Sequence, residues 1–208
     1  MSDAAALRRR PLVLADLLPG TVVRDVLLVA GAAGFVGLLA QISIRLPFTP
    51  VPITGQTLGV LLAGTALGWR RAGLSMALYA LAGVAGVPWF AGGSSGYASA
   101  SFGYIVGFFA AAVLCGYLAE RGADRSIVKS IPAMIAGEAA IYVFGLTWLA
   151  LDLHLSASAT LTEGLTPFLA GDLIKAAIAA GLLPTAWLLA GRRGRGTPSP
   201  EVTGPGED

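Results

Sequence analysis

The sequence predicts an all-α fold: a polytopic membrane protein that forms a bundle of six transmembrane helices, with both termini in the cytoplasm. Charged residues make up only 12% of the 208 residues, whereas a soluble domain carries roughly 25%. The mean hydropathy is +0.74, and the apolar residues gather in six runs. A bilayer core of about 30 Å requires roughly 20 apolar residues per helix, so six spans use about 120 residues and leave only short loops.

The six apolar segments define the organisation of the chain, although the second and third are short for full spans. We expect a cytoplasmic N-terminal flank over residues 1–20, a six-helix membrane domain over 21–191 and a disordered cytoplasmic tail over 192–208. The tail is rich in Gly, Pro and acidic residues, so it cannot bury enough apolar area to offset its ordering entropy. The predicted helices cover residues 22–44, 53–69, 72–90, 99–119, 127–151 and 167–190.

The positions of the basic residues predict the orientation, because positively charged loops stay on the cytoplasmic side. The connections between the six spans fall alternately on the two sides of the membrane. Of the fourteen Lys and Arg residues, Arg45 lies in a connection on the predicted outer side, and Lys175 lies within a span. The other twelve fall in the flanks and alternate connections, which places both termini in the cytoplasm. These are Arg8, Arg9, Arg10, Arg24, Arg70, Arg71, Arg121, Arg125, Lys129, Arg192, Arg193 and Arg195.

Several classes of function are excluded or disfavoured by composition. The basic residues form small clusters between apolar segments, which disfavours nucleic-acid binding. The single cysteine, Cys115, cannot form an internal disulfide, and it is interpreted as a small buried hydrophobe. The single histidine, His154, lies in a predicted outer loop, so no metal-ligand set and no cofactor site are expected. No G-x-x-x-x-G-K-[ST] phosphate loop occurs, so energy for any transport comes from a partner or a gradient.

The strongest candidate for a functional site is the sequence Gly171-Asp172-Leu173-Ile174-Lys175, near the start of the sixth predicted span. Ionisable residues inside membrane helices are costly and usually face a bundle interior or a cavity. Asp172 and Lys175 are three residues apart and therefore share a helix face. They form either an intrahelical ion pair with a structural role or a polar ligand clamp. A clamp of this kind suits a ligand with both N–H and carbonyl groups, such as a cyclic urea.

Two outer connections contain further candidates. Pro47, Pro50 and Pro52 force an extended segment before the second span, where Thr54 and Gln56 offer hydrogen-bonding groups to a ligand. The other is the glycine-rich segment 86–97, which holds two large aromatic residues. These either wall an apolar pocket or belong to the interfacial aromatic belt, and they are Trp89 and Tyr97.

Two further features keep alternative interpretations. Glu138 in the fifth span can pair with Lys175, relay a proton or stay protonated among the helices. Glycines at four-residue spacing favour close packing of helices in the bilayer. Ala30 and Gly34 form a similar stripe on the first helix that can instead dock a partner subunit.

Six short motifs, taken in their order along residues 24–190, resemble the BioY family. The resemblance implies a six-helix substrate-binding S component of an energy-coupling factor transporter in the bacterial cytoplasmic membrane. It also implies that Asp172, Lys175, Gln56 and Thr54 bind biotin, and that the partners are a membrane coupling subunit and two ATPases. The motifs are Gln41-Ile-Ser-Ile, Val51-Pro-Ile-Thr-Gly-Gln-Thr-Leu-Gly, Val87-Pro-Trp-Phe-Ala-Gly-Gly, Phe102-Gly-Tyr, Ile141-Tyr-Val-Phe-Gly-Leu-Thr-Trp-Leu and Pro167-Phe-Leu-Ala-Gly-Asp-Leu-Ile-Lys.

Two other classes of function remain as alternatives. A self-contained, gradient-driven carrier of small solutes would use Glu138 and would move its substrate without an ATPase. An intramembrane enzyme that acts on a lipid would need an acid or base among Asp172, Glu138 and His154, but the sequence offers no convergent catalytic set. We therefore expect no catalytic residues.

Overall fold

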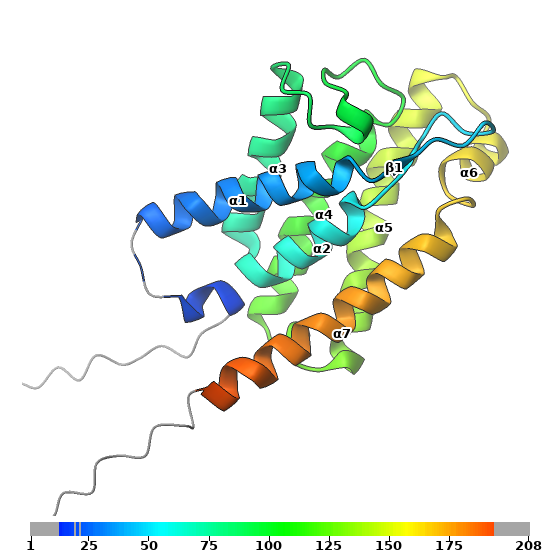
Figure 1. The fold of residues 1–208 in the computed structure, drawn as a ribbon. Coiled ribbons are helices and arrows are strands. Elements are labelled where there is room, and N and C mark those ends of the chain that lie inside the picture. Colours follow the sequence, from blue (N-terminus) through cyan, green and yellow to red (C-terminus); the bar gives the residue numbers. More distant parts are fainter. Residues whose placement is uncertain (1–12, 19, 21, 194–208) are drawn as a thin grey trace, which may run out of the picture.

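Seven α-helices make up most of the residues that the computed structural model describes, which are 13–18, 20 and 22–193 (Figure 1). The predicted all-α class is confirmed; the strands form only a two-residue antiparallel pair. In chain order the elements are η1 (Leu14–Leu17), α1 (Val22–Ala40), β1 (Ser43–Ile44), β2 (Ile53–Thr54), α2 (Gln56–Leu67), α3 (Trp69–Val84), η2 (Ala91–Gly93), α4 (Phe102–Glu120), η3 (Ala123–Arg125), α5 (Ile127–Asp152), α6 (Ala157–Gly164) and α7 (Leu169–Arg193).

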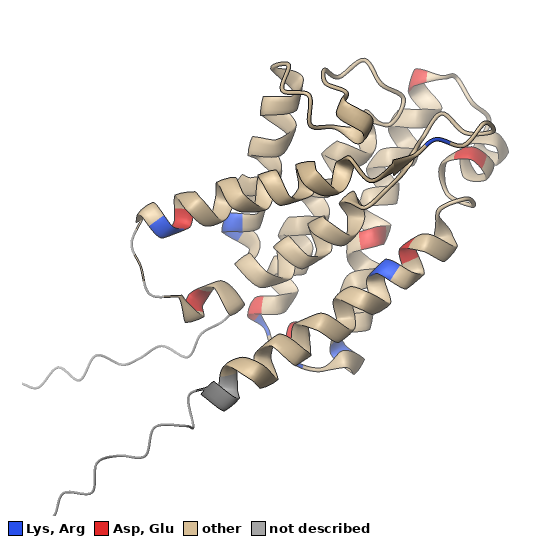
Figure 2. Ribbon diagram, viewed as in Figure 1, with Lys and Arg blue, Asp and Glu red and all other residues tan. Residues whose placement is uncertain are grey.

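Among the described residues, four helices are long and apolar enough to cross a bilayer: α1, α4, α5 and residues Leu169–Ala190 of α7. The helices α2 and α3 have 12 and 16 residues, and a 12-residue helix is only about 18 Å long. Large apolar side chains cover the outside of the described helices, as lipid contact requires. Figure 2 shows most charged residues near the ends of the helices, with a small group further inside on α5 and α7. The chain is therefore a multi-pass membrane protein.

Helix α6 is the main element that the sequence does not predict, because residues 152–166 read as a loop. The helix has only eight residues, and Ser156 caps it by accepting a hydrogen bond from the backbone N–H of Ala159 at 3.3 Å. A segment this short and this rich in Ser and Thr has no apolar run, so hydropathy does not reveal it. The N-cap serine was the available signal.

The expected boundaries differ from the structure in further places. The first predicted segment reaches residue 44, but α1 ends at Ala40, and Ser43–Ile44 form β1. The third predicted segment was expected to reach residue 90, but α3 ends at Val84, and Gly86 follows with a positive φ of 107°. In the N-terminal flank, residues Leu14–Leu17 form η1 and bury Ala15. At the other end, α7 extends to Arg193, two residues into the predicted tail. Residues 1–12 and 194–208, and with them most of the predicted flank and tail, lie outside the described residues.

Helix α4 lies at the centre of the bundle and packs through small residues against its neighbours. Ala111, Ala112 and Cys115 are fully buried. A Cβ atom added at Gly107 would lie 2.8 Å from the Cα of Ile141 in α5, and one added at Gly64 would lie 3.0 Å from the carbonyl oxygen of Ala112. These glycines therefore serve close packing within the chain.

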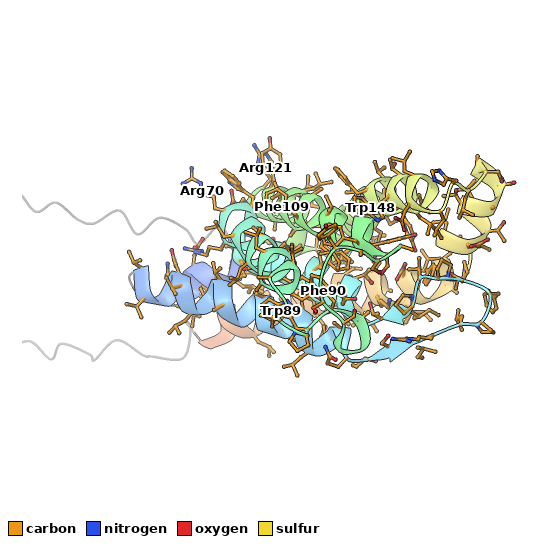
Figure 3. The ribbon with its side chains drawn as sticks, turned by 90° about the horizontal axis from the view of Figure 1, so that it is seen from above. Arg70, Trp89, Phe90, Phe109, Arg121 and Trp148 are labelled. Carbon is orange, nitrogen blue, oxygen red and sulfur yellow. The ribbon has the colours of Figure 1, made fainter. Side chains whose placement is uncertain are left out.

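The connections meet in two groups at opposite ends of the bundle. At one end, the proline segment contacts α6 through the Thr49 hydroxyl, which donates to the Glu163 carbonyl at 2.7 Å. At the other end, Arg71 of α3 pairs with Asp16 of η1 at 2.9 Å. Arg70 and Arg121 lie toward this second end (Figure 3). The group that includes the proline segment also encloses the cavity described next.

Candidate ligand-binding site

A cavity lies at the end of the bundle where the proline segment, the η2 loop, α4, α5 and α7 meet. Its empty space, including the open mouth, is about 710 Å³. Four of the six residues predicted to bind substrate line it: Thr54, Gln56, Asp172 and Lys175. The structure thus brings together residues that are more than a hundred positions apart in the sequence.

Asp172 lies in the first turn of α7 and accepts three hydrogen bonds from side chains. Its Oδ1 accepts from the Lys175 ammonium at 2.9 Å and from the Thr57 hydroxyl at 3.2 Å, and its Oδ2 accepts from the Tyr142 hydroxyl. An ionised carboxylate offers about four lone-pair sites. One site on Oδ2 therefore remains for an N–H donor of a ligand, and the N-terminal end of α7 favours the negative charge.

Lys175 has no spare donor in this arrangement. Its ammonium donates to the backbone carbonyl of Thr54 at 2.7 Å, to Oδ1 of Asp172 at 2.9 Å and to the hydroxyl of Thr57 at 3.2 Å. Because an ammonium has three N–H groups, a ligand carbonyl can bind Lys175 only by replacing one of these acceptors. The Thr57 hydroxyl is the longest contact and carries no charge, so it is the acceptor that is replaced most easily.

The proline segment delivers Thr54 and Gln56 to the cavity from β2 and the start of α2. The Thr54 hydroxyl donates to Oε1 of Gln56 at 2.9 Å, and Nε2 of Gln56 donates to the hydroxyl of Tyr79 at 2.7 Å. Gln56 is buried. An amide group has two N–H donors, and the hydrogen bond to Tyr79 uses one of them. The second N–H of Gln56 can therefore donate to a ligand.

Aromatic side chains form the apolar part of the cavity. Ring contacts link them to the core, and the centroids of Phe90 and Tyr79 are 5.2 Å apart in an edge-to-face arrangement. The cavity therefore combines a charged wall on α7 with an apolar wall, which suits a ligand with a polar head and an apolar body. The aromatic lining residues are Phe90, Phe102, Tyr104, Phe108, Tyr142 and Phe168.

The other two predicted residues, Trp89 and Tyr97, are not among the residues that line the cavity. The Trp89 indole N–H donates to the backbone carbonyl of Tyr79 at 3.0 Å, and its ring lies against Gly37 of α1. Trp89 thus supports Tyr79, which in turn holds Gln56. Figure 3 shows Trp89 beside its neighbour Phe90, the residue of this pair that reaches the cavity. Tyr97 is 63% exposed.

Tyr142 is a polar residue of the site that the sequence pattern did not single out. It lies on α5 and joins that helix to α7 through its hydrogen bond with Asp172. The available signal was its position four residues after Glu138 on an otherwise apolar helix, because residues four apart share a face. A second polar residue on that face indicated that the face points inward.

The predicted docking stripe on α1 is open. Ala30 is exposed and lines a groove between α1 and α3, and no atom lies within 4 Å of a Cβ added at Gly34. The stripe is therefore accessible in the described part of the chain. Its role in docking stays a prediction.

Comparison with known proteins gives consistent results. The BioY family model matches residues 8–192. The "Biotin transporter BioY" of Rhizobium etli is 38% identical over 170 residues, which cover 76% of this chain and 89% of the relative. The "Biotin transporter BioY2" of Lactococcus lactis subsp. cremoris is 37% identical over 152 residues, which cover 72% and 82%.

A solved structure shares the fold. It is described as the crystal structure of "the S-component for biotin from an ECF-type ABC transporter". The TM-score is 0.72 at 24% sequence identity, and the match covers 80% of this chain and 92% of the other. The arrangement of helices around the cavity is therefore one that a known S component also adopts.

Proposed function

Because the chain belongs to the BioY family, we propose that it serves biotin uptake across the bacterial cytoplasmic membrane as the high-affinity substrate-binding subunit of an energy-coupling factor transporter. The observation that carries this proposal is the largely buried pair of Asp172 and Lys175 at the wall of an otherwise largely apolar cavity. A structural ion pair would not need a cavity beside it. A ligand clamp does.

The chemistry of biotin fits the free hydrogen-bonding capacity of the cavity. The ureido ring presents N–H groups and a carbonyl close together. One N–H can use the remaining lone pair of Asp172, and the carbonyl can take the place of Thr57 on Lys175 or accept from Gln56. The thiophane ring and the alkyl chain would lie against the aromatic wall, and the serines of the outer loop line the cavity for the carboxylate: Ser94, Ser95, Ser99 and Ser101.

Six membrane crossings with both termini in the cytoplasm are part of the proposal. The basic residues support this orientation, because Arg70 and Arg71 lie in the first turn of α3, and Arg121 and Arg125 lie in the connection between α4 and α5. Cysteine labelling tests it, since the native Cys115 is fully buried. A thiol introduced at the exposed Ala98 should react with an impermeant reagent added from outside whole cells, whereas one at the exposed Lys129 should react only in inverted vesicles.

The proposed partners are a membrane coupling subunit and two ATPases. The chain has no phosphate loop of the Walker type, so a transporter driven by ATP needs separate subunits. The open stripe of Ala30 and Gly34 on α1 is the proposed docking face. Small residues there would let a partner helix approach closely within the bilayer.

A gradient-driven carrier is a second candidate, and one observation favours it. Glu138 is buried on α5, and neither of its carboxyl oxygens has a hydrogen-bond partner among the described residues. Uptake of biotin by the purified chain in liposomes under a pH gradient would support this candidate. Uptake that requires ATP and the partner subunits would support the first.

Calorimetric titration of the detergent-purified chain tests the substrate. We expect tight binding of biotin and at least about hundredfold weaker binding of lipoate, which has a sulfur-containing ring and a carboxylate but no ureido group. Lipoate would leave the polar groups of the cavity that bind the ureido ring without partners, which accounts for a difference in affinity of this size. Equal binding of both compounds, or no binding of biotin, would contradict the proposal.

A further inference from the structure

A second hollow lies beside the cavity, between α5 and α7. It is a crevice with an empty space of about 520 Å³ including its mouth. Two residues, Tyr142 and Asp172, line both the crevice and the cavity. The hydrogen bond between these two side chains therefore forms the partition between the two spaces.

Glu138 also lines the crevice. It lies four residues before Tyr142 on α5, so the two side chains share one helix face. Only 7% of Glu138 is exposed, and both of its carboxyl oxygens lack a hydrogen-bond partner in the part of the chain that the structure describes. A charged carboxylate buried in apolar surroundings without a donor is strongly disfavoured, so the arrangement fits a carboxyl group that holds a proton.

Among the described residues, the cation that faces Glu138 is Lys175, and it is already paired. Asp172 and Lys175 on α7 face it as an ion pair, and the three N–H groups of Lys175 already have acceptors. On α4 the titratable group that interacts with Glu138 is the buried thiol of Cys115, which donates to a backbone carbonyl. On α5 itself, Tyr142 donates to Asp172.

From this arrangement we propose that Glu138 is a proton-binding site whose occupancy is linked to biotin binding in the adjoining cavity. If Glu138 loses its proton, its charge repels Asp172 and competes for Lys175. The clamp that binds the ureido group is then disrupted. Biotin and the proton thus bind together, and by thermodynamic linkage each strengthens the binding of the other. This inference rests on the proposed function, because it takes biotin as the ligand of the cavity.

Biotin affinity measured by calorimetry from about pH 6 to about pH 9, below the range in which lysine and tyrosine side chains titrate, tests the inference. Wild type should bind most tightly at the acidic end and weaken toward the alkaline end, by up to about tenfold per pH unit for one linked proton. Glu138→Gln keeps a neutral side chain of the same shape, so its affinity should stay level over this range. Glu163→Gln removes a carboxyl that lines neither space, and it should follow wild type.

A second readout does not depend on any variant. At the alkaline end, wild type should take up close to one proton per biotin bound, measured by repeating the titration in buffers with different enthalpies of ionisation. Affinity that is level with pH, together with no proton uptake by wild type, would overturn the inference while leaving biotin binding intact. A pH profile of Glu138→Gln that matches wild type would overturn it too. Failure of wild type to bind biotin at every pH would instead reject the proposed function itself.

Discussion

The ammonium of Lys175 lies 2.9 Å from Oδ1 of Asp172, three residues earlier on the same helix, and both side chains are largely buried at the edge of the cavity. Burying such a pair has a desolvation cost that the attraction between the charges often fails to exceed, and well-packed apolar residues can serve stability equally well. The pair is therefore better explained by what it offers to a ligand. The predictions below concern the groups that hold it and the scaffold around it.

Tyr142→Phe should weaken biotin binding about tenfold or more, because it removes one hydrogen bond to the charged Asp172 while keeping the aromatic ring. A hydrogen bond to a charged group contributes about 1.5–3 kcal/mol. Titration with biotin checks this, with Tyr117→Phe as the control, since Tyr117 is exposed on α4 and does not line the cavity. Unchanged affinity in Tyr142→Phe would show that Asp172 does not need this partner.

Gly107→Ala should lower the stability of the folded chain by about 1–3 kcal/mol, the usual cost of forcing extra atoms into a packed core. The added Cβ would lie 2.8 Å from backbone atoms of Ile141, which cannot rotate away. The matched control is Gly31→Ala on α1, where no atom lies within 4 Å. Thermal unfolding in detergent compares the two variants, and equal melting temperatures would contradict the packing described for α4 and α5.

Gly34→Leu should keep biotin binding and lose transport driven by the partners. The position is open, so the larger side chain should fit the isolated chain but block close approach of a partner helix. Gly181→Leu provides the control on α7, where the added Cβ also meets no atom within 4 Å. ATP-dependent uptake by the reconstituted complex is the measurement. Normal uptake with Gly34→Leu would remove α1 from the proposed docking face.

Asp124→Asn should change how stability depends on pH. Burial raises the pKa of Asp124 in the connection between α4 and α5, despite the hydrogen bond from the Trp187 indole at 2.6 Å. The folded chain then binds the proton more tightly than the unfolded chain does. The contribution of protonated Asp124 to the stability of the fold is fully present below the pKa that this group has in the unfolded chain, about 4. It is lost as the pH rises through the pKa that the group has in the folded chain.

Above about pH 4, the melting temperature of wild type should therefore include a decrease with rising pH. The melting temperature of Asp124→Asn should not show this decrease. An asparagine keeps an oxygen that can accept from Trp187, so the contact itself is preserved. Asp152→Asn, at the exposed end of α5, should retain the wild-type profile. Identical profiles for wild type and Asp124→Asn would contradict the assignment of this decline to Asp124.

The parts of the site that could be predicted follow from local rules. Asp172 and Lys175 are three residues apart in an apolar helix, so both the shared face and the inward direction follow from helix geometry and the cost of charge in the membrane. Thr54 and Gln56 follow from the prolines, which prevent a helix and leave extended backbone before α2. The all-α class follows from the lengths of the apolar runs.

The rest depends on contacts between distant segments. The bond from Lys175 to the Thr54 carbonyl joins residues 121 positions apart, and no local pattern encodes it. Trp89 and Tyr97 lie in a segment with several glycines at positive φ, where no periodicity tells which side chain turns inward. Phe90 reaches the cavity in place of Trp89, its neighbour. Helix α6 was missed because its signal is a single capping serine.

Biotin affinity of the purified chain, compared among wild type, Asp172→Asn and Lys175→Met, is the most direct test of the central claim. Wild type should bind tightly. Each variant should lose at least about a hundredfold in affinity while remaining monodisperse, since it removes a charge-assisted contact and leaves its partner unpaired. Tight binding by wild type and by both variants would contradict the claim that this pair forms the ligand clamp.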